Sequence, residues 1–231
     1  RRFRCRTCPC FKVHVARPHT VSSVGQRVGV REFERSGVLL SKSTLCDMFH
    51  RSADLLSPLS RRILELVAAA AYINADETSL RVLQKNECRR GFVWDFIAKD
   101  DDGHMMVAYR FSPDRSGQTP IEVLGNSTGF LQVDGYTGYN QVTTPKKRKR
   151  AGCWSHGRRK FFEAVATKPD EAHFAIDLIR EIYEVEYVAA EKNILGTEKH
   201  RALRTTQSRA KVVKLMEWAE AEKPKHNPQG P

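Results

Sequence analysis

The sequence lacks a run of about 20 apolar residues, so no segment is long enough to cross a membrane as a helix. It also lacks a segment that resembles a secretory signal peptide. Acidic residues are scarce relative to basic ones: 27 Asp and Glu stand against 39 Lys and Arg, which leaves a formal net charge of +12. Such an excess favours the phosphate backbone of a nucleic acid as a partner, the alternative being a soluble basic protein without a specific partner.

The six cysteines are too unevenly scattered to form a disulfide framework, and a nucleic-acid protein belongs in a reducing compartment. Cys5 and Cys8 form a Cys-x-x-Cys knuckle, which supplies half of a tetrahedral Zn²⁺ site. Three interpretations stay open: a second pair precedes Arg1, His14 and His19 close the site at irregular spacing, or the cysteines are incidental. Because the chain begins without methionine and stops within a polar tail, we expect it to be a piece of a longer protein.

Two short segments carry the clearest chemical signal, since each reads as a strand that ends in an aspartate. Asp76 lies in NADETSLRVL, and Asp134 lies in LQVDGYTGYN. A single aspartate at a strand end is usually a turn residue, but two carboxylates in matching positions can hold a hard divalent cation. In a basic protein this pair favours a Mg²⁺ or Mn²⁺ site that acts on phosphodiesters.

Alternating apolar residues predict three strands in succession, at residues 72–83, 91–99 and 104–111. Turn residues separate the second strand from the third, so we expect an antiparallel meander. Thr119 and Pro120 then predict a capped helix that ends near Gly125, and a further strand follows at 130–135. The predicted fold class is α/β, with the order β-β-β-α-β.

A strand reached through a helical crossover can lie parallel beside the first strand. We therefore expect Asp76 and Asp134 to meet at one edge of the sheet. Because side chains alternate along a strand, only one of the consecutive residues Asp76 and Glu77 can face the site.

Helices are predicted before and after these strands along the chain. Residues 31–50 suggest two short helices around Gly37, with Ser41 or Ser43 as an N-cap, in the manner of a helix-turn-helix or of any helical hairpin. Ser57 and Pro58 predict the start of another helix. Its apolar stripe consists of Leu59, Ile63, Leu66, Val67 and Ala70. Two long amphipathic helices, near 171–192 and 198–222, suggest a helical insertion or a small helical domain. The predicted apolar stripe of the first consists of Ala175, Leu178, Ile179, Ile182 and Val185, and the less regular stripe of the second consists of Leu203, Ala210, Val213 and Met216.

A basic run follows the second aspartate and is predicted to clamp a phosphate backbone. It consists of Lys146, Lys147, Arg148, Lys149 and Arg150. A solvated loop and a nuclear-import signal are the alternatives. Arg158, Arg159 and Lys160 extend the positive face, while Phe161, Phe162 and Val165 are expected to pack inward. Cys153 and His156 form half of a metal site by spacing, but such a pair at a helix start is more often structural.

Four of these segments, in this order, resemble the transposases of the insertion sequence 66 family: ADETSLRVL, SPDRSGQTPIEVL, GFLQVDGYTGYN and AGCWSHGRRKFFEA. FERSGVLLSKSTL resembles the segment ahead of the family's catalytic domain, and CRTC resembles the second half of its zinc ribbon. The resemblance implies an RNase H-like core with an Asp-Asp-Glu metal triad, in which Asp76 and Asp134 match the two aspartates. It further implies DNA transposition by two divalent metal ions, action on transposon ends and target DNA as a homo-oligomer, and a bacterial, nucleoid-associated cytoplasmic location.

The chain departs from the family in its third acid. The family's glutamate belongs to an Asn-rich helical motif, and Glu217, Glu220 and Glu222 do not lie in such a motif. We expect four regions: a zinc-ribbon remnant at 1–30, a helical DNA-binding or linker segment at 31–71, an incomplete catalytic core at 72–168, and a helical insertion with a truncated tail at 169–231. A non-catalytic DNA-binding remnant and an interaction module are the alternatives.

Overall fold

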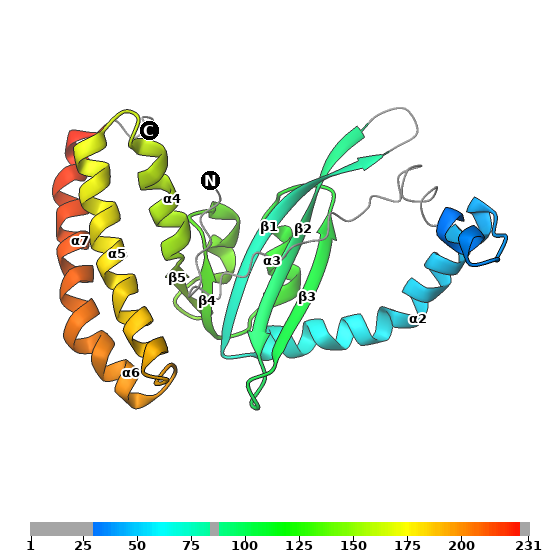
Figure 1. Ribbon diagram of the computed structural model, residues 1–231, viewed down its shortest axis with the longest axis horizontal. Coiled ribbons are helices and arrows are strands. Elements are labelled where there is room, and N and C mark those ends of the chain that lie inside the picture. Colours follow the sequence, from blue (N-terminus) through cyan, green and yellow to red (C-terminus); the bar gives the residue numbers. More distant parts are fainter. Residues whose placement is uncertain (1–29, 84–87, 227–231) are drawn as a thin grey trace. The chain divides into compact units, whose positions relative to one another are not determined.

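The computed structural model describes residues 30–83 and 88–226 (Figure 1). These residues form two compact units, one over 30–152 that contains the sheet and one over 153–226 that is helical. The predicted zinc half-site of Cys5 and Cys8 lies outside the described residues. Among the described helices, none combines the length and apolar character needed to span a membrane.

The first unit is built on a five-stranded mixed sheet in the order β3-β2-β1-β4-β5. The strands are β1 (Tyr72–Leu83), β2 (Cys88–Lys99), β3 (Met105–Ser112), β4 (Gly129–Val133) and β5 (Arg148–Gly152). β1, β2 and β3 are antiparallel neighbours, whereas β4 is parallel to β1 and β5 is parallel to β4. This arrangement confirms the predicted α/β, RNase H-like sheet. β5 was not predicted, because its residues read as part of the basic run.

One face of the sheet forms the hydrophobic core of this unit. Alternate residues of the central strands are buried on it, namely Ile73, Ala75, Trp94, Phe96, Leu131 and Val133. Helix α2 (Lys42–Ala69), helix α3 (Gln118–Leu124) and the 3-10 helix η1 (Thr137–Val142) supply the residues that cover this face, including Val67, Leu124 and Tyr139. Burying an apolar side chain of this size contributes about 1.5–3 kcal/mol. Period-2 alternation therefore fixes which side of each strand faces the core.

Helix α2 (Lys42–Ala69) begins at the predicted cap Ser41, whose hydroxyl accepts a hydrogen bond from the Thr44 amide. It follows a short helix at residues 30–35 and a turn in which Gly37 has a φ of +80°. The predicted helix start at Ser57 and Pro58 is wrong, because α2 runs through Pro58 without ending. Proline removes one backbone hydrogen bond, but the packing of the helix's second half against the sheet outweighs that loss.

The predicted apolar stripe of this helix is partly wrong. Val67 is fully buried and Ile63 packs against the core, but Leu59 is 57% and Leu66 is 41% exposed. Leu64, which was not assigned to the stripe, packs against the core beside Val67.

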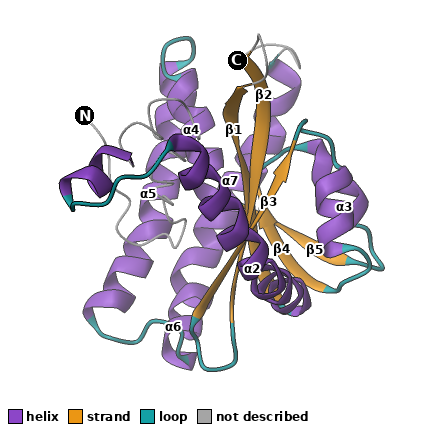
Figure 2. Ribbon diagram, turned by 90° about the vertical axis from the view of Figure 1, so that its right-hand side faces the viewer, coloured by secondary structure: helices purple, strands orange, loops and turns teal. Residues whose placement is uncertain are grey.

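Helix α3 (Gln118–Leu124) is the crossover between β3 and β4 (Figure 2). It begins two residues earlier than predicted, after Gly117, and Thr119 is buried inside it instead of capping it. A Cβ atom on Gly117 would lie 2.6 Å from the carbonyl oxygen of Gly138 in η1 (Thr137–Val142). Only glycine permits this backbone approach.

The second unit consists of packed helices, and Figure 1 shows α5 and α7 side by side. Its elements are α4 (Trp154–Ala164), α5 (Pro169–Glu191), α6 (Glu198–Leu203), a π-helical turn (Arg204–Ser208), α7 (Arg209–Glu222) and a 3-10 turn (Lys223–Lys225).

The predicted stripe of α5 is confirmed, since Ala175, Leu178, Ile179, Ile182 and Val185 are all buried. The stripe predicted for the second helix is wrong in register. Leu215 is buried, whereas Val213 and Met216 are about half exposed. Phe162 on α4 is also exposed instead of packing inward, and its neighbour Phe161 contacts Trp218.

Candidate metal centre and nucleic-acid interface

Asp76 and Asp134 occupy equivalent positions on two neighbouring parallel strands. The register of β1 and β4 pairs Tyr72 with Phe130 and Asn74 with Gln132. Each aspartate follows two residues after the last of these pairs. Their backbone positions therefore match across the sheet at the carboxyl end of β4.

The expectation that the first strand ends at Asp76 is wrong. β1 continues to Leu83, paired with β2, while β4 stops at Val133. Asp76 thus lies where β1 extends past its shorter neighbour, and its side chain is exposed. Asp134 is the first residue after β4, and its Oδ1 accepts a 2.8 Å hydrogen bond from the Tyr136 amide. This turn holds the Asp134 carboxylate close to the end of the strand.

Asp76 and Glu77 lie on opposite faces of β1, as alternation predicts. The Glu77 side chain is only 1% exposed and lies on the core face with Ile73 and Ala75. Asp76 shares the other face with Asn74 and with Tyr72, whose hydroxyl donates a 2.6 Å hydrogen bond to Gln132 Oε1. Glu77 is therefore separated from the open face by the strand itself.

Asp95 is a third carboxylate that the sequence analysis missed. It lies directly opposite Asp76 in the antiparallel pair of β1 and β2, so the two side chains share a face. Burial, and secondarily the charge of Asp76, raise the pKa of Asp95 to about 7. No local pattern marks this pair, which follows from the register of β1 and β2, regular from Asn74–Ile97 to Leu83–Cys88.

A polar network around the buried Glu77 connects β1 to two loops. Glu77 Oε1 accepts hydrogen bonds from the Arg115 guanidinium, and Glu77 Oε2 accepts one of 2.8 Å from the Tyr139 hydroxyl. The Arg115 guanidinium lies over the Tyr136 ring at 4.2 Å, and the Tyr136 hydroxyl donates to the Arg115 carbonyl oxygen. The network therefore joins β1 to the loop before α3 and to the loop after β4.

Electrostatic effects show that this network and the aspartates are close in space. Burial raises the pKa of Glu77, the hydrogen bonds from Arg115 and Tyr139 oppose the rise, and the charge of Asp134 adds to it. Burial followed by the charge of Glu77 raises the pKa of Tyr139, with smaller contributions from Asp76 and Asp134. Negative charge is therefore concentrated around the middle of β1 and the carboxyl end of β4.

The structure corrects the assignment of Arg148 to a DNA-binding surface. Arg148 is 1% exposed, and its guanidinium donates to the carbonyl oxygens of Ala68, Ala70 and Phe130 and to the Ser127 hydroxyl. Two of these carbonyls belong to the carboxyl end of α2, where a cation is favoured by the helix dipole. Arg148 is thus part of the core and cannot reach a phosphate.

Lys149 and Arg150 lie on opposite faces of β5, and the first two lysines of the basic run precede the strand. Arg150 donates to the carbonyl oxygens of Asp134 at 2.7 Å and Tyr136 at 2.6 Å, so it clamps the loop that carries Asp134. Lys149 is exposed on the opposite face, where its Nζ lies 5.9 Å from the Phe130 ring. Lys146 is exposed and Lys147 is half-buried in the preceding turn.

The remaining predicted residues lie in the helical unit. Arg159 and Lys160 are about three-quarters exposed and both pair with Glu163, at 3.1 and 2.9 Å, while Arg158 lies over the Phe162 ring. Such exposed pairs contribute little to stability, so these cations stay available to a phosphate.

Cys153 and His156 flank the first turn of α4, where the Cys153 carbonyl oxygen accepts from the Gly157 amide. In the part of the chain that the structure describes, they belong to no group of three potential metal ligands.

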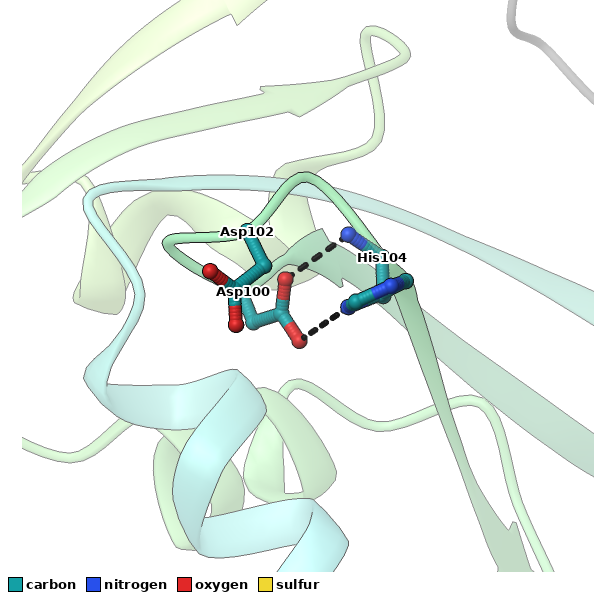
Figure 3. Close-up of side chains that lie close together, drawn as sticks. All are labelled: Asp100, Asp102 and His104. Atoms are coloured by element: carbon teal, nitrogen blue, oxygen red, sulfur yellow. Dashed lines mark hydrogen bonds and ion pairs between the residues drawn. The ribbon is translucent and has the colours of Figure 1, made fainter.

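One such group does exist, in the turn between β2 and β3. The carboxylates of Asp100 and Asp102 and the His104 ring lie close together on the surface (Figure 3). Asp100 accepts a 2.7 Å hydrogen bond from the His104 amide and lies 3.2 Å from His104 Nδ1. Burial opposes the change, but these bonds lower the pKa of Asp100 below its ordinary value. Closure of the hairpin turn accounts for this cluster without an ion.

Comparison with known proteins agrees with this geometry. Residues 27–231 match the model of the transposase IS66 family. Similar curated proteins come from Sinorhizobium fredii (strain NBRC 101917 / NGR234) and are themselves uncharacterized. The protein y4qI is 30% identical over 202 residues, which cover 81% of this chain and 37% of y4qI. The protein y4hP is 25% identical over 209 residues, 83% of this chain and 38% of y4hP.

The chain therefore spans less than two-fifths of the length of these relatives. The family model covers far more than half of the sequence and includes both aspartates. The chain belongs to the IS66 family of transposases.

Proposed function

We propose that this chain carries the Asp-Asp part of a metal-dependent transposase centre, which cleaves phosphodiester bonds of DNA and transfers the freed strand. The observation that carries the proposal is the register of β1 and β4, which brings Asp76 and Asp134 to matching positions two residues beyond their last common pair. Two carboxylates at matching positions on adjacent strands are an arrangement that can hold a divalent ion.

The donor set fits a Mg²⁺ or Mn²⁺ ion. Asp76 and Asp134 offer only oxygen atoms, which hard cations prefer. The negative charge gathered near them, with burial, raises the pKa values of Glu77, Asp95 and Tyr139, and a nearby cation would offset that charge. When bound, the ion polarises the phosphate and activates the attacking oxygen. The two aspartates would hold it, and Arg150 would keep the Asp134 loop in place.

DNA is the proposed partner, as transposon ends and target, and cations that are exposed or half-buried supply the contacts. In the sheet unit these are Lys146, Lys147 and Lys149, and in the helical unit Arg158, Arg159 and Lys160. We also propose that the active complex is a homo-oligomer and that it acts on the nucleoid in the cytoplasm. The predicted regions 1–30, 31–71, 72–168 and 169–231 stay proposals as well.

The triad is proposed to be incomplete in this chain. Glu217, Glu220 and Glu222 lie on α7 in the helical unit, and the last two form surface ion pairs with Lys223 and Lys225. Two of three ligands bind a metal more weakly and leave the cleavage geometry unfinished, so we expect metal binding to exceed catalysis.

Nicking of supercoiled DNA by the purified chain, with Mg²⁺ or Mn²⁺ and with a chelator, tests the proposal. Metal-dependent nicking that is lost in Asp76→Asn and in Asp134→Asn supports a catalytic centre and shows that no third acid is needed. DNA binding with a steep salt dependence, no nicking, and metal binding lost in both variants supports the incomplete centre. DNA binding that is indifferent to metal, with no metal bound at the aspartates, supports the alternative of a non-catalytic DNA-binding remnant.

A further inference from the structure

Glu77 is buried beside a proposed metal site and yet faces away from it. Its side chain is 1% exposed, on the core face of β1, while Asp76 lies on the other face. A buried carboxylate requires hydrogen-bond donors, and both of its oxygens have them. Arg115 donates to Oε1, and the Tyr139 hydroxyl donates to Oε2 at 2.8 Å. Both Glu77 oxygens therefore accept from protein groups, on the face of β1 opposite Asp76.

The donors to Glu77 come from the segments that surround Asp134. Tyr139 lies in η1, five residues after Asp134, and its ring packs against Trp94 with the ring centres 5.6 Å apart. Arg115 lies over the ring of Tyr136, whose amide donates to the Asp134 carboxylate. Both routes lead from the residue next to Asp76 to the loop that presents Asp134.

Close backbone packing makes this connection stiff. Gly117, two residues after Arg115, meets Gly138 so closely that a Cβ atom would lie 2.6 Å from the Gly138 carbonyl oxygen. A Cβ atom on Gly138 would lie 2.2 Å from the Tyr136 ring. The loop before α3 and the loop after β4 thus move as one piece, with Glu77 joining them to β1.

We propose that Glu77 and Tyr139 form a positioning pair that holds the Asp134 loop at the distance from Asp76 that a divalent ion requires. The pairing of β1 with β4 ends at Asn74 and Gln132, before the aspartates. Beyond that point, side-chain contacts set the distance between β1 and the Asp134 loop. The Glu77–Tyr139 hydrogen bond joins β1 directly to η1 in this region. The inference rests on the proposed metal site and adds the residues that set its geometry.

The test is an Mn²⁺ titration of the full chain, in which the electron paramagnetic resonance signal of the free ion measures how much Mn²⁺ is unbound. Tyr139→Phe removes the hydroxyl and keeps the ring that packs against Trp94. Tyr72→Phe is a matched control, because it also deletes a hydroxyl that joins β1 to β4, through the 2.6 Å bond to Gln132, but on the open face. Glu77→Gln tests the other partner with little change in shape.

We expect Mn²⁺ affinity to fall about tenfold or more in Tyr139→Phe and Glu77→Gln, because replacing residues that position metal ligands typically has an effect of this size. In Tyr72→Phe the affinity should change less than about twofold. A lower melting temperature of Tyr139→Phe with unchanged Mn²⁺ affinity would show a merely structural hydrogen bond and overturn the inference. Equal losses in both tyrosine variants would also overturn it.

The Asp76→Asn variant separates this inference from the proposed function. If Asp76→Asn loses Mn²⁺ and Tyr139→Phe does not, the metal site stands and the positioning pair is wrong. If Asp76→Asn binds Mn²⁺ as the unmodified chain does, or if that chain binds none, the metal site fails and the positioning pair fails with it.

Discussion

Asp95 lies directly opposite Asp76 across the antiparallel pair of β1 and β2, which puts two carboxylates side by side on one face of the sheet. Two like charges at directly opposed positions destabilise a strand pair. The burial of Asp95 and its proximity to Asp76 raise its pKa to about 7, against 3.8 for an ordinary aspartate. Folding stability should therefore depend on pH through this residue.

The direction of that dependence follows from proton binding. Between about pH 4 and 7 the folded chain keeps a proton on Asp95 that the unfolded chain has released. Stability contributed by this proton falls as pH rises through that range and levels off above it. Asp95→Asn should lack this decline. In urea unfolding, the free energy of unfolding of the variant relative to that of the unmodified chain should therefore increase from pH 5 to pH 8. A constant difference between the two proteins would contradict the assignment.

Asp114→Asn is the control for this experiment. Hydrogen bonds from the Ser116 hydroxyl and amide lower the pKa of Asp114, although burial opposes them. Its contribution is therefore complete above the unfolded pKa of 3.8 and is lost only at lower pH. Because its serine partners do not titrate in this range, its effect on stability should be the same at pH 5 and pH 8.

Arg148 and Lys149 are neighbours in the basic run but should respond to substitution in opposite ways. Arg148→Met leaves several buried carbonyl oxygens without donors, including those at the end of α2, and should cost about 3 kcal/mol or more of unfolding free energy. Lys149→Met is on the surface and should change stability by less than about 0.5 kcal/mol. Similar stabilities of the two variants in urea unfolding would contradict the structural role of Arg148.

The lysines of the basic run should act on DNA affinity through salt. Replacement of Lys146, Lys147 or Lys149 by methionine should weaken binding of unrelated DNA sequences uniformly. Each substitution should reduce the slope of log affinity against log salt by about one. Fluorescence anisotropy with a labelled duplex measures this slope. An unchanged slope in the triple variant would remove this run from the DNA interface.

Gly117 should not tolerate a side chain. A Cβ atom there would lie 2.6 Å from the Gly138 carbonyl oxygen, so Gly117→Ala must displace the loop after β4 and should cost about 1–3 kcal/mol. Gly157→Ala is the control, since a Cβ atom there meets nothing within 4 Å and the residue lies within α4. This change should leave stability equal or raise it by up to about 1 kcal/mol. Thermal unfolding of both variants distinguishes a close backbone contact from a general intolerance of alanine.

The parts of the fold that follow a simple period were predictable from the sequence. Alternating residues located β1 to β4, and the crossover helix indicated that β4 lies parallel to β1. β5 was missed because its buried position is occupied by Arg148, a residue that carries no apolar signal. Pro58 was read as a helix start, since local preference favours that position, but tertiary packing carries α2 through it.

The candidate site was predictable only in part, for a related reason. Asp76 lies within a recognisable strand and Asp134 follows one, whereas Asp95 becomes relevant only once the register of β1 and β2 is known. Glu77 contacts Arg115 and Tyr139, which are 38 and 62 positions away in the sequence. Local patterns do not encode which of many polar side chains meet across such separations.

The central claim is that Asp76 and Asp134 share one divalent ion, and Mn²⁺ titration of the single and double asparagine variants tests it most directly. We predict that Asp76→Asn and Asp134→Asn each remove measurable binding and that the double variant is no worse than either one, because both lose the same site. Asp102→Asn, in the exposed turn between β2 and β3, should bind Mn²⁺ like the unmodified chain. Binding that survives both site substitutions and is lost in Asp102→Asn would contradict the account.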